Sequence, residues 1–414
     1  MQEETIEILK KYSQEHILEY LSKFTKEEQE NLEKQIMTIN FEQLKKLYEQ
    51  TKQKPCIEEK MIEYIPYTDK AKLSQARKES LKEIGKNIIC AKKYAVITMA
   101  GGQGTRLGHS GPKGTYRLNT ANGPKYIFEI IIDNLKKAQE EYGVTIPWYV
   151  MTSRENNEDT IKFLEEHSYF GYDKDKIKFF MQGELPLLNK EGKVIFDKEK
   201  KIKEAADGNG GIYEAIVNSG LLQEMQKEQI EWIFVGNVDN ILAELTDTVL
   251  LGLTIEQEHK IGVKSVAKTK PEEKVGVFSK VNGKPGVIEY IDFTKEMAEE
   301  RDENGELRYS EVNIGSYVFN RSVFENLADM KLPYHIAIKK SGYLTEEGTY
   351  IEPADTNIYK FEAFIFDAFA RYDDITILRG KREEEFAPVK NSTGNDSPET
   401  AVALYNEKIK SKGD

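Results

Sequence analysis

The sequence predicts an α/β protein: a Rossmann-like, mixed but mainly parallel sheet with helices on both faces, preceded by a helical N-terminal region. Two observations predict this fold. From Tyr94 onward, apolar stretches of strand length alternate with stretches of helical periodicity, the βαβ rhythm of a parallel sheet. A glycine-rich loop follows the first apolar stretch, and α/β proteins hold nucleotide phosphates at this end of a strand. A chain of 414 residues is also too long for one core, so two or three domains are expected.

Residues 1–93 are predicted to be helical, because apolar residues recur there at helical spacing. Thr25 and Glu28 have the spacing of a capping box, so we expect a helix to begin at this point. Asn40 is a candidate cap for the next helix. This region carries no residue pattern of obvious chemistry.

The main domain is expected to span 94–380. Its candidate strands are 94–99, 146–152, 177–181 and 231–236, and its candidate helices are 124–142, 155–167 and 212–227. Connections in such a sheet are right-handed, and ligands gather at the carboxyl ends of the strands.

Two later segments differ from this rhythm. Residues 261–319 are richer in strand-forming residues, and a turn near Gly283 predicts a hairpin, so we expect a smaller mixed sheet over the pocket. Residues 381–414 form a short C-terminal segment that ends in a charged run, for which we expect a frayed helix or a tail.

Composition excludes several classes of protein. The net charge of −12 argues against a nucleic-acid or anionic-membrane surface. No apolar run approaches the length of a membrane span, and the acidic N-terminus does not resemble a signal peptide. The two cysteines, Cys56 and Cys90, have no metal-binding spacing and are expected to be reduced. These features predict a cytoplasmic protein.

The loop Ala100–Gly108, followed by Pro112 and Lys113, is the most informative motif. Its glycines let the backbone turn sharply and bring several N–H groups to an anion, and two cations lie in the same loop. It is not a P-loop, because His109 stands where that motif needs a lysine. It is not the dinucleotide fingerprint either, because its last glycine comes one residue late.

The spacing G-G-x-G-T-x-L-G-x-x-x-P-K resembles the signature of nucleotide-sugar pyrophosphorylases. Within them it is most similar to the UDP-N-acetylglucosamine pyrophosphorylase branch of the eukaryotic-type UDP-sugar pyrophosphorylase family. The resemblance covers nearly the whole chain. Its later segments are Gln182-Gly183, 207–213, 238–240, Gly276-Val277, Glu289-Tyr290, Asn313-Ile314, 360–362 and 385–391.

This resemblance implies a uridylyltransferase that forms a UDP-sugar and pyrophosphate from UTP and a hexose 1-phosphate, with N-acetylglucosamine 1-phosphate favoured. Both reactants are polyanions and the attacking phosphate is already ionised. Catalysis therefore needs cations, Mg²⁺ and positioning more than it needs a general base.

The glycine loop would bind the triphosphate. Its backbone N–H groups would contact the phosphates, and its two cations would neutralise the leaving pyrophosphate and the α-phosphate. The nucleotide-binding candidates are Ala100, Gly101, Gly102 and Gly104, and the catalytic candidates are Arg106 and Lys113, joined near the C-terminus by Lys390.

Asp239 is the predicted metal ligand. It follows the apolar run 232–235 and therefore lies at the carboxyl end of a predicted strand. Mg²⁺ takes one or two carboxylates together with substrate phosphates. No second protein ligand can be named from the sequence.

The remaining site residues are implied by the resemblance alone. Gln182 would bind the edge of the uracil, and Gly208 would let the backbone approach the base. The sugar-binding candidates are Asn209, Glu289, Asn313 and Lys360.

Several alternatives stay open. Glucose 1-phosphate or a broad range of sugar 1-phosphates could be the substrate, because one contact can change the preference. A non-catalytic nucleotide-sugar sensor is less consistent with the full set of cations and the metal ligand, and an NAD-dependent dehydrogenase is excluded by the glycine spacing. Longer family members carry a further C-terminal domain that could serve as a contact surface between subunits. This sequence does not include it, so we expect a monomer.

Overall fold

The computed structural model describes residues 2–53, 61–328 and 330–412, and the chain divides into two compact units. The smaller unit comprises Met1–Glu59, Gly183–Gly211 and Leu332–Ile365. The larger unit comprises Lys60–Gln182, Ile212–Lys331 and Phe366–Asp414. Each unit is described by itself below.

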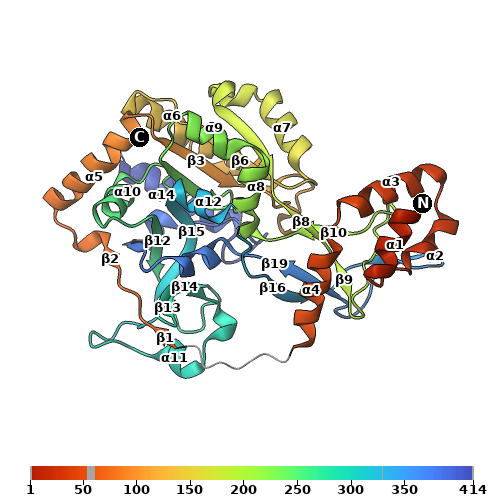
Figure 1. The fold of residues 1–414 in the computed structure, drawn as a ribbon. Coiled ribbons are helices and arrows are strands. Elements are labelled where there is room, and N and C mark those ends of the chain that lie inside the picture. Colours follow the sequence, from red (N-terminus) through yellow and green to blue (C-terminus); the bar gives the residue numbers. More distant parts are fainter. Residues whose placement is uncertain (1, 54–60, 329, 413–414) are drawn as a thin grey trace. The chain divides into compact units, whose positions relative to one another are not determined.

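In the described residues, the larger unit is built on a mixed sheet of 11 strands whose main path is mostly parallel, which confirms the predicted fold class (Figure 1). The main strand order is β2-β20-β12-β15-β11-β3-β6-β7, and β13 joins β1 and β14 to this path. The strands are β1 (Ile62–Glu63), β2 (Thr68–Asp69), β3 (Tyr94–Met99), β6 (Trp148–Thr152), β7 (Ile177–Met181), β11 (Trp232–Asn237), β12 (Ile261–Ala267), β13 (Val277–Val281), β14 (Lys284–Ile288), β15 (Glu311–Asn320) and β20 (Thr376–Gly380). A separate hairpin pairs β4 (Arg117–Thr120) with β5 (Gly123–Tyr126).

Helices cover both faces of this sheet. Val318 of β15 belongs to the core that also holds residues of α5, α6, α10 and α14, whereas the ring of Phe319 contacts Tyr213 of α8 and Phe324 of α12. Consecutive strand residues point to opposite faces, so the two groups of helices lie on opposite sides. The helices are α5 (Gln75–Cys90), α6 (Ile127–Tyr142), α7 (Asn157–Glu166), α8 (Ile212–Asn218), α9 (Leu221–Lys227), α10 (Thr248–Glu256), α11 (Lys295–Glu299), α12 (Ser322–Leu327), α13 (Arg382–Glu385) and α14 (Pro398–Lys412).

Helices α5 and α10 pack with their backbones in contact (Figure 1). A methyl group added to Gly85 would collide with the carbonyl oxygen of Thr248, and one added to Gly252 would collide with that of Leu81. Glycine at both positions therefore allows the close approach of the two helices.

In its described residues, the smaller unit combines four α-helices with short strands. The capping box at Thr25 is confirmed: its hydroxyl accepts from the Glu28 N–H (3.3 Å) and Glu28 accepts from the Thr25 N–H (2.7 Å). Asn40 caps the next helix, as predicted, by accepting from the Gln43 N–H (3.0 Å). The elements are α1 (Glu3–Lys11), α2 (Ile17–Tyr20), α3 (Lys26–Thr38), α4 (Phe41–Lys52), β8 (Glu184–Pro186), β9 (Leu188–Asn189), β10 (Glu204–Ala206), β16 (His335–Lys339), β17 (Tyr343–Leu344), β18 (Tyr350–Ile351) and β19 (Ile358–Glu362).

The structure corrects several local expectations. The segment 261–319 does not form a separate smaller sheet, because β12 and β15 pair with each other and with central strands of the large sheet. The helix expected over 124–142 begins at Ile127, since the preceding residues pair in β5. The helix expected over 212–227 is two helices, interrupted at Gly220, whose φ is +76°. The predicted hairpin is confirmed and turns at Asn282 and Gly283.

The C-terminal segment is more ordered than expected. Its final helix, α14, is 15 residues long and buries Ala401. On the same helix, Lys408 donates to the carbonyl oxygens of Leu242 (2.9 Å) and Glu384 (2.8 Å). Of the two cysteines, Cys90 is a free, exposed thiol, and Cys56 lies outside the described residues. In the described parts of the chain, no helix combines the length and apolar character that crossing a bilayer requires.

Candidate active site

Three strands of the large sheet bring polar residues to one edge. β3 and β11 are parallel, and Met99 pairs with Asn237 at their carboxyl ends. β15 runs antiparallel to β11, and its Ser316 pairs with Gly236, so the residues just before Ser316 lie at the same edge. The glycine loop, Asp239 and Asn313 are thereby gathered from three distant parts of the sequence.

Some backbone N–H groups of the glycine loop form hydrogen bonds within the fold, and others do not. Ala100 donates its N–H to Met151 (2.7 Å) and Gly104 donates to Gly111 (2.9 Å), so both amides serve the fold. The N–H groups of Gly101 and Gly102, in contrast, donate to no acceptor in the described part of the chain. Two adjacent free amides beyond a strand end are suited to bind an anion.

Two residues to which the sequence assigns no role support this loop. The buried Asn156 donates from Nδ2 to the carbonyl oxygen of Ala100 (2.9 Å), and its Oδ1 accepts from the Ser153 N–H (2.8 Å). His109 packs its ring against Gly104, and its Nε2 lies 2.7 Å from the hydroxyl oxygen of Thr115. An Asn four residues beyond the end of β6 is a weak sequence signal for the first, and none marks the second.

Lys113 and Asp239 form an ion pair. The Nζ of Lys113 lies 3.2 Å from Oδ2 of Asp239, although 126 residues separate them in sequence. Both side chains are mostly buried, with 18% and 15% of their surfaces exposed. The predicted phosphate-binding cation and the predicted metal ligand thus share one place. Arg106, in contrast, is exposed on a 3-10 turn of the loop.

Gln182 lies against the glycine loop. Its backbone N–H donates to Thr152 (2.8 Å) at the end of β6, and its side chain packs over Gly101. A Cβ atom at position 101 would lie 2.7 Å from Nε2 of Gln182, so glycine is needed there for this contact. The amide of Gln182 therefore lies beside Gly101, one of the two residues with a free N–H group.

Glu289 and Asn313 are brought together by Gly276. The Asn313 N–H donates to the Gly276 carbonyl oxygen (2.9 Å), and a Cβ atom on Gly276 would lie 3.0 Å from Oε1 of Glu289. The Oδ1 of Asn313 accepts from the Gly315 N–H (3.0 Å) and from the Tyr317 hydroxyl (2.9 Å). Its Nδ2 is therefore the group that can donate to a ligand.

Lys390 lies on a segment that runs beside Asp239. The Val389 N–H donates to the Asp239 carbonyl oxygen (2.9 Å), and the Lys390 N–H donates to Asp396 (2.7 Å). The Nζ of Lys390 lies 5.4 Å from the centre of the Phe386 ring. The structure thus places the last predicted cation one residue from the strand pairing that holds Asp239.

Three predicted residues belong to the smaller unit, where two of them lie on one loop. Gly208 has a φ of +93°, and a side chain there would collide with the backbone of Ala363. Asn209 accepts at Oδ1 from the Ile365 N–H (3.0 Å). Lys360, on β19, pairs with Glu362 (2.9 Å). The 207–211 loop is therefore fixed against the segment that follows Lys360.

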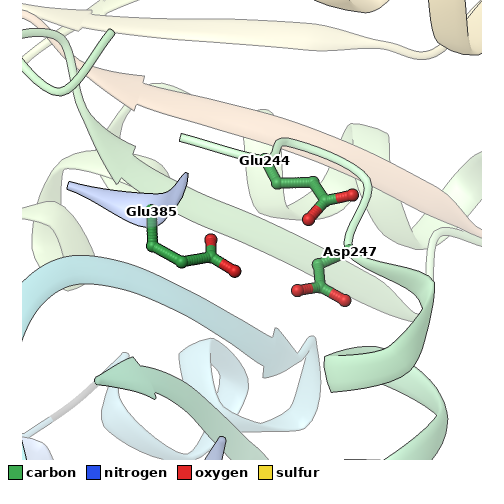
Figure 2. A group of neighbouring side chains, drawn as sticks. All are labelled: Glu244, Asp247 and Glu385. Atoms are coloured by element: carbon green, nitrogen blue, oxygen red, sulfur yellow. The ribbon is translucent and has the colours of Figure 1, made fainter. Parts of the chain in front are cut away.

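Apart from Asp239, the larger unit contains a cluster of three acidic residues: Glu244, Asp247 and Glu385 (Figure 2). It is the only described cluster of three potential ligand groups, but lysines already occupy it. The buried Lys264 pairs with Asp247 and with Glu385 (2.7 Å), and Lys70 lies 3.3 Å from Asp247 and 3.6 Å from Glu385. This cluster is an ion-pair network, and its chemistry does not favour a metal ion.

Charge interactions dominate this network. Burial opposes ionisation of Asp247, but the ammonium groups of Lys264 and Lys70 outweigh it and hold the pKa of that carboxyl well below its usual value. Burial also opposes the charge on Lys264, yet Asp247 and Glu385 raise the pKa of its ammonium group. Asp247 and Lys264 are therefore both charged at neutral pH.

Comparison with known proteins agrees with this picture. The family model described as UTP–glucose-1-phosphate uridylyltransferase matches residues 38–398. A human protein named UDP-N-acetylhexosamine pyrophosphorylase-like protein 1 is 38% identical over 77% of this chain and 65% of its own length. The UDP-N-acetylglucosamine pyrophosphorylase of Saccharomyces cerevisiae is 37% identical over 78% of this chain and 69% of its own. The chain thus spans about two thirds of these relatives.

A solved structure is also similar. It is the uridine diphosphate N-acetylglucosamine pyrophosphorylase of Trypanosoma brucei in complex with an inhibitor. Its TM-score is 0.81 at 29% identity, and the match covers 96% of this chain and 83% of that one. The likeness therefore extends over nearly the whole fold described above.

Proposed function

Because the chain belongs to the UTP–glucose-1-phosphate uridylyltransferase family, we propose that it transfers a uridylyl group from UTP to a hexose 1-phosphate. The pairing of Lys113 with Asp239 beside two free loop amides is the observation that carries this proposal. A general nucleotide-binding fold needs amides for phosphates, but a half-buried cation and carboxylate at the same place serve a reaction in which charge moves between phosphates.

In the proposed reaction, a phosphate oxygen of the sugar 1-phosphate attacks the α-phosphorus of UTP. The bond from that phosphorus to the bridging oxygen breaks, and pyrophosphate leaves with the electron pair. The amides of Gly101 and Gly102 would hold the triphosphate, and Lys113 would stabilise the charge that develops on the α-phosphate. Arg106 and Lys390 would neutralise the other phosphate oxygens.

Asp239 fits a magnesium ion, because Lys113 pairs with its Oδ2 alone and its Oδ1 has no hydrogen-bond partner among the described residues. It offers one carboxylate, and the described residues place no further acidic cluster around it, so substrate phosphates and water would complete the shell, as is usual for this ion. When bound, Mg²⁺ supplies a positive charge to the phosphate oxygens. Glu244, Asp247 and Glu385 are less suited to it, because each already pairs with Lys70 or Lys264.

We propose N-acetylglucosamine 1-phosphate as the preferred sugar substrate. The names of the yeast and trypanosome proteins support this choice, and so does Asn313, whose free Nδ2 is suited to donate to an acetamido oxygen. Glucose 1-phosphate is the second candidate, because the family model carries its name. We also propose that the protein is cytoplasmic and that it is a monomer. Light scattering would test the oligomeric state.

A pyrophosphate-release assay with UTP, Mg²⁺ and a panel of sugar 1-phosphates tests the proposal. We expect turnover that is highest, as kcat/KM, with N-acetylglucosamine 1-phosphate. A preference for glucose 1-phosphate would overturn the choice of sugar but not the reaction. UTP binding by calorimetry without turnover on any sugar would indicate a sensor instead, and NAD binding without UTP binding would overturn the assignment.

A further inference from the structure

The segments that carry Asp239 and Lys390 are joined by a short antiparallel pairing. Asn240 is opposite Pro388, the Val389 N–H donates to Asp239 (2.9 Å), and the Ile241 N–H donates to Ala387 (3.3 Å). Neither segment is part of a described strand of the sheet. The relative position of the two segments therefore depends on this pairing and on side chains that reinforce it.

The side chain of Asn240 is the main reinforcement. Its Nδ2 donates to the Glu385 carbonyl oxygen (2.9 Å), and its Oδ1 accepts from the Ala387 N–H (2.9 Å) and the Leu242 N–H (3.3 Å). Asn240 is 3% exposed, so water does not compete for these groups. One amide thus bonds to both segments at once, using its donor and its acceptor.

The segment that Asn240 holds is anchored at its start. The carboxylate of Glu385 pairs with Lys264 (2.7 Å) inside the ion-pair network, while its carbonyl oxygen accepts from Asn240. Because Lys264 lies on β12, Glu385 is tied to the sheet. Between Glu385 and Lys390, the hydrogen bonds of Asn240 and the backbone pairing beside it hold the segment in place.

We propose that Asn240 is a positioning residue that sets the placement of Lys390 relative to Asp239. This inference rests on the proposed function, since it takes these two residues as the phosphate-binding cation and the metal ligand. Asn240 touches neither substrate nor metal, and acts by holding two backbone segments in register. A displacement of about 1 Å between groups that share one substrate can cost on the order of 10²-fold in rate.

Two substitutions separate the roles of the amide. Asn240→Asp keeps the size and the acceptor but replaces the donor, so a carboxylate oxygen would face the Glu385 carbonyl. Asn240→Ala removes both. Asn320→Ala is the matched control, because Asn320 also accepts from a backbone N–H (Ser322, 3.2 Å) but pairs with Trp232 at the opposite end of β11.

The test measures kcat, the Mg²⁺ dependence and the melting temperature of each variant, below the onset of unfolding. We expect Asn240→Asp and Asn240→Ala to lower kcat by on the order of 10²-fold and to raise the Mg²⁺ concentration for half-maximal rate. Asn320→Ala should keep both values, whatever its melting temperature.

A double-mutant cycle with Lys390→Ala identifies the route of the effect. If Asn240 acts through Lys390, then Asn240→Ala costs much less in the Lys390→Ala background than in the wild type. Independent, multiplying losses would overturn the inference, as would a wild-type kcat in Asn240→Asp. A wild-type protein without any turnover would instead count against the proposed function, so the two failures are distinguishable.

Discussion

Replacing Lys264 by methionine should destabilise the protein strongly. Lys264, Asp247 and Glu385 are 3%, 2% and 5% exposed as side chains, so Lys264→Met leaves two buried carboxylates without their nearest cation. Removing one partner of a buried pair costs about 3–5 kcal/mol. Lys70 stays within 3.3 Å of Asp247 but is 27% exposed, so it offsets part of the loss, and we expect about 3 kcal/mol.

The pH dependence of this loss has a definite sign. In the wild type, the pKa of Asp247 is lower in the folded state than in the unfolded state, so its ionisation stabilises the fold above the unfolded-state pKa. This stabilisation is lost as the pH falls through the folded-state pKa. In Lys264→Met, the burial of Asp247 is less well opposed, so the pKa of that carboxyl rises above its unfolded-state value. The folded state then binds more protons than the unfolded state, and the destabilisation should be larger at about pH 8 than at about pH 5.

Urea unfolding of both proteins at the two pH values measures this effect. The double variant Lys264→Met, Asp247→Asn is the control, because asparagine keeps an oxygen to accept from the Val249 and Leu250 N–H groups while removing one charge. It should recover part of the lost free energy of unfolding. A loss below about 1 kcal/mol in Lys264→Met, or a loss that is larger at acidic pH, would refute the reasoning.

Four further outcomes are expected. Lys113→Ala and Asp239→Ala should each lower kcat by about 10²- to 10³-fold with unchanged circular dichroism, because each removes a charge that acts on the phosphates; near wild-type rates would contradict the mechanism. EDTA should stop the reaction and Mg²⁺ restore it, in a pyrophosphate-release assay. Gly101→Ala should push Gln182 away and raise the KM for UTP, and an unchanged KM would show that Gln182 does not contact the nucleotide. Thr25→Ala should cost about 1 kcal/mol in thermal unfolding, and no effect would mean that the capping box is not formed in solution.

Local chemistry explains which features the sequence could predict. The strands beside the glycine loop and Asp239 were predictable, because an apolar run and the polar residue that follows it are adjacent in sequence. The capping box at Thr25 is local in the same way.

Non-local pairing explains what the sequence could not predict. The position of β15 between β11 and β12 depends on partners more than 40 residues away, and residue spacing carries no signal for it. Lys264 lies in a strand where a charge usually indicates a solvent-facing position, and only its meeting with Asp247 and Glu385 makes burial possible. The support of the glycine loop by Asn156 likewise depends on a contact between two loops.

Because α5 and α10 are in close contact, one added methyl group between them should make the protein sensitive to heat. Thr248, whose carbonyl oxygen faces Gly85, follows Asp247 directly. A single added methyl in Gly85→Ala would wedge the two helices apart at the point where α10 begins, and would strain the buried charges behind it. We therefore expect Gly85→Ala to lower the melting temperature without changing any residue of the candidate active site.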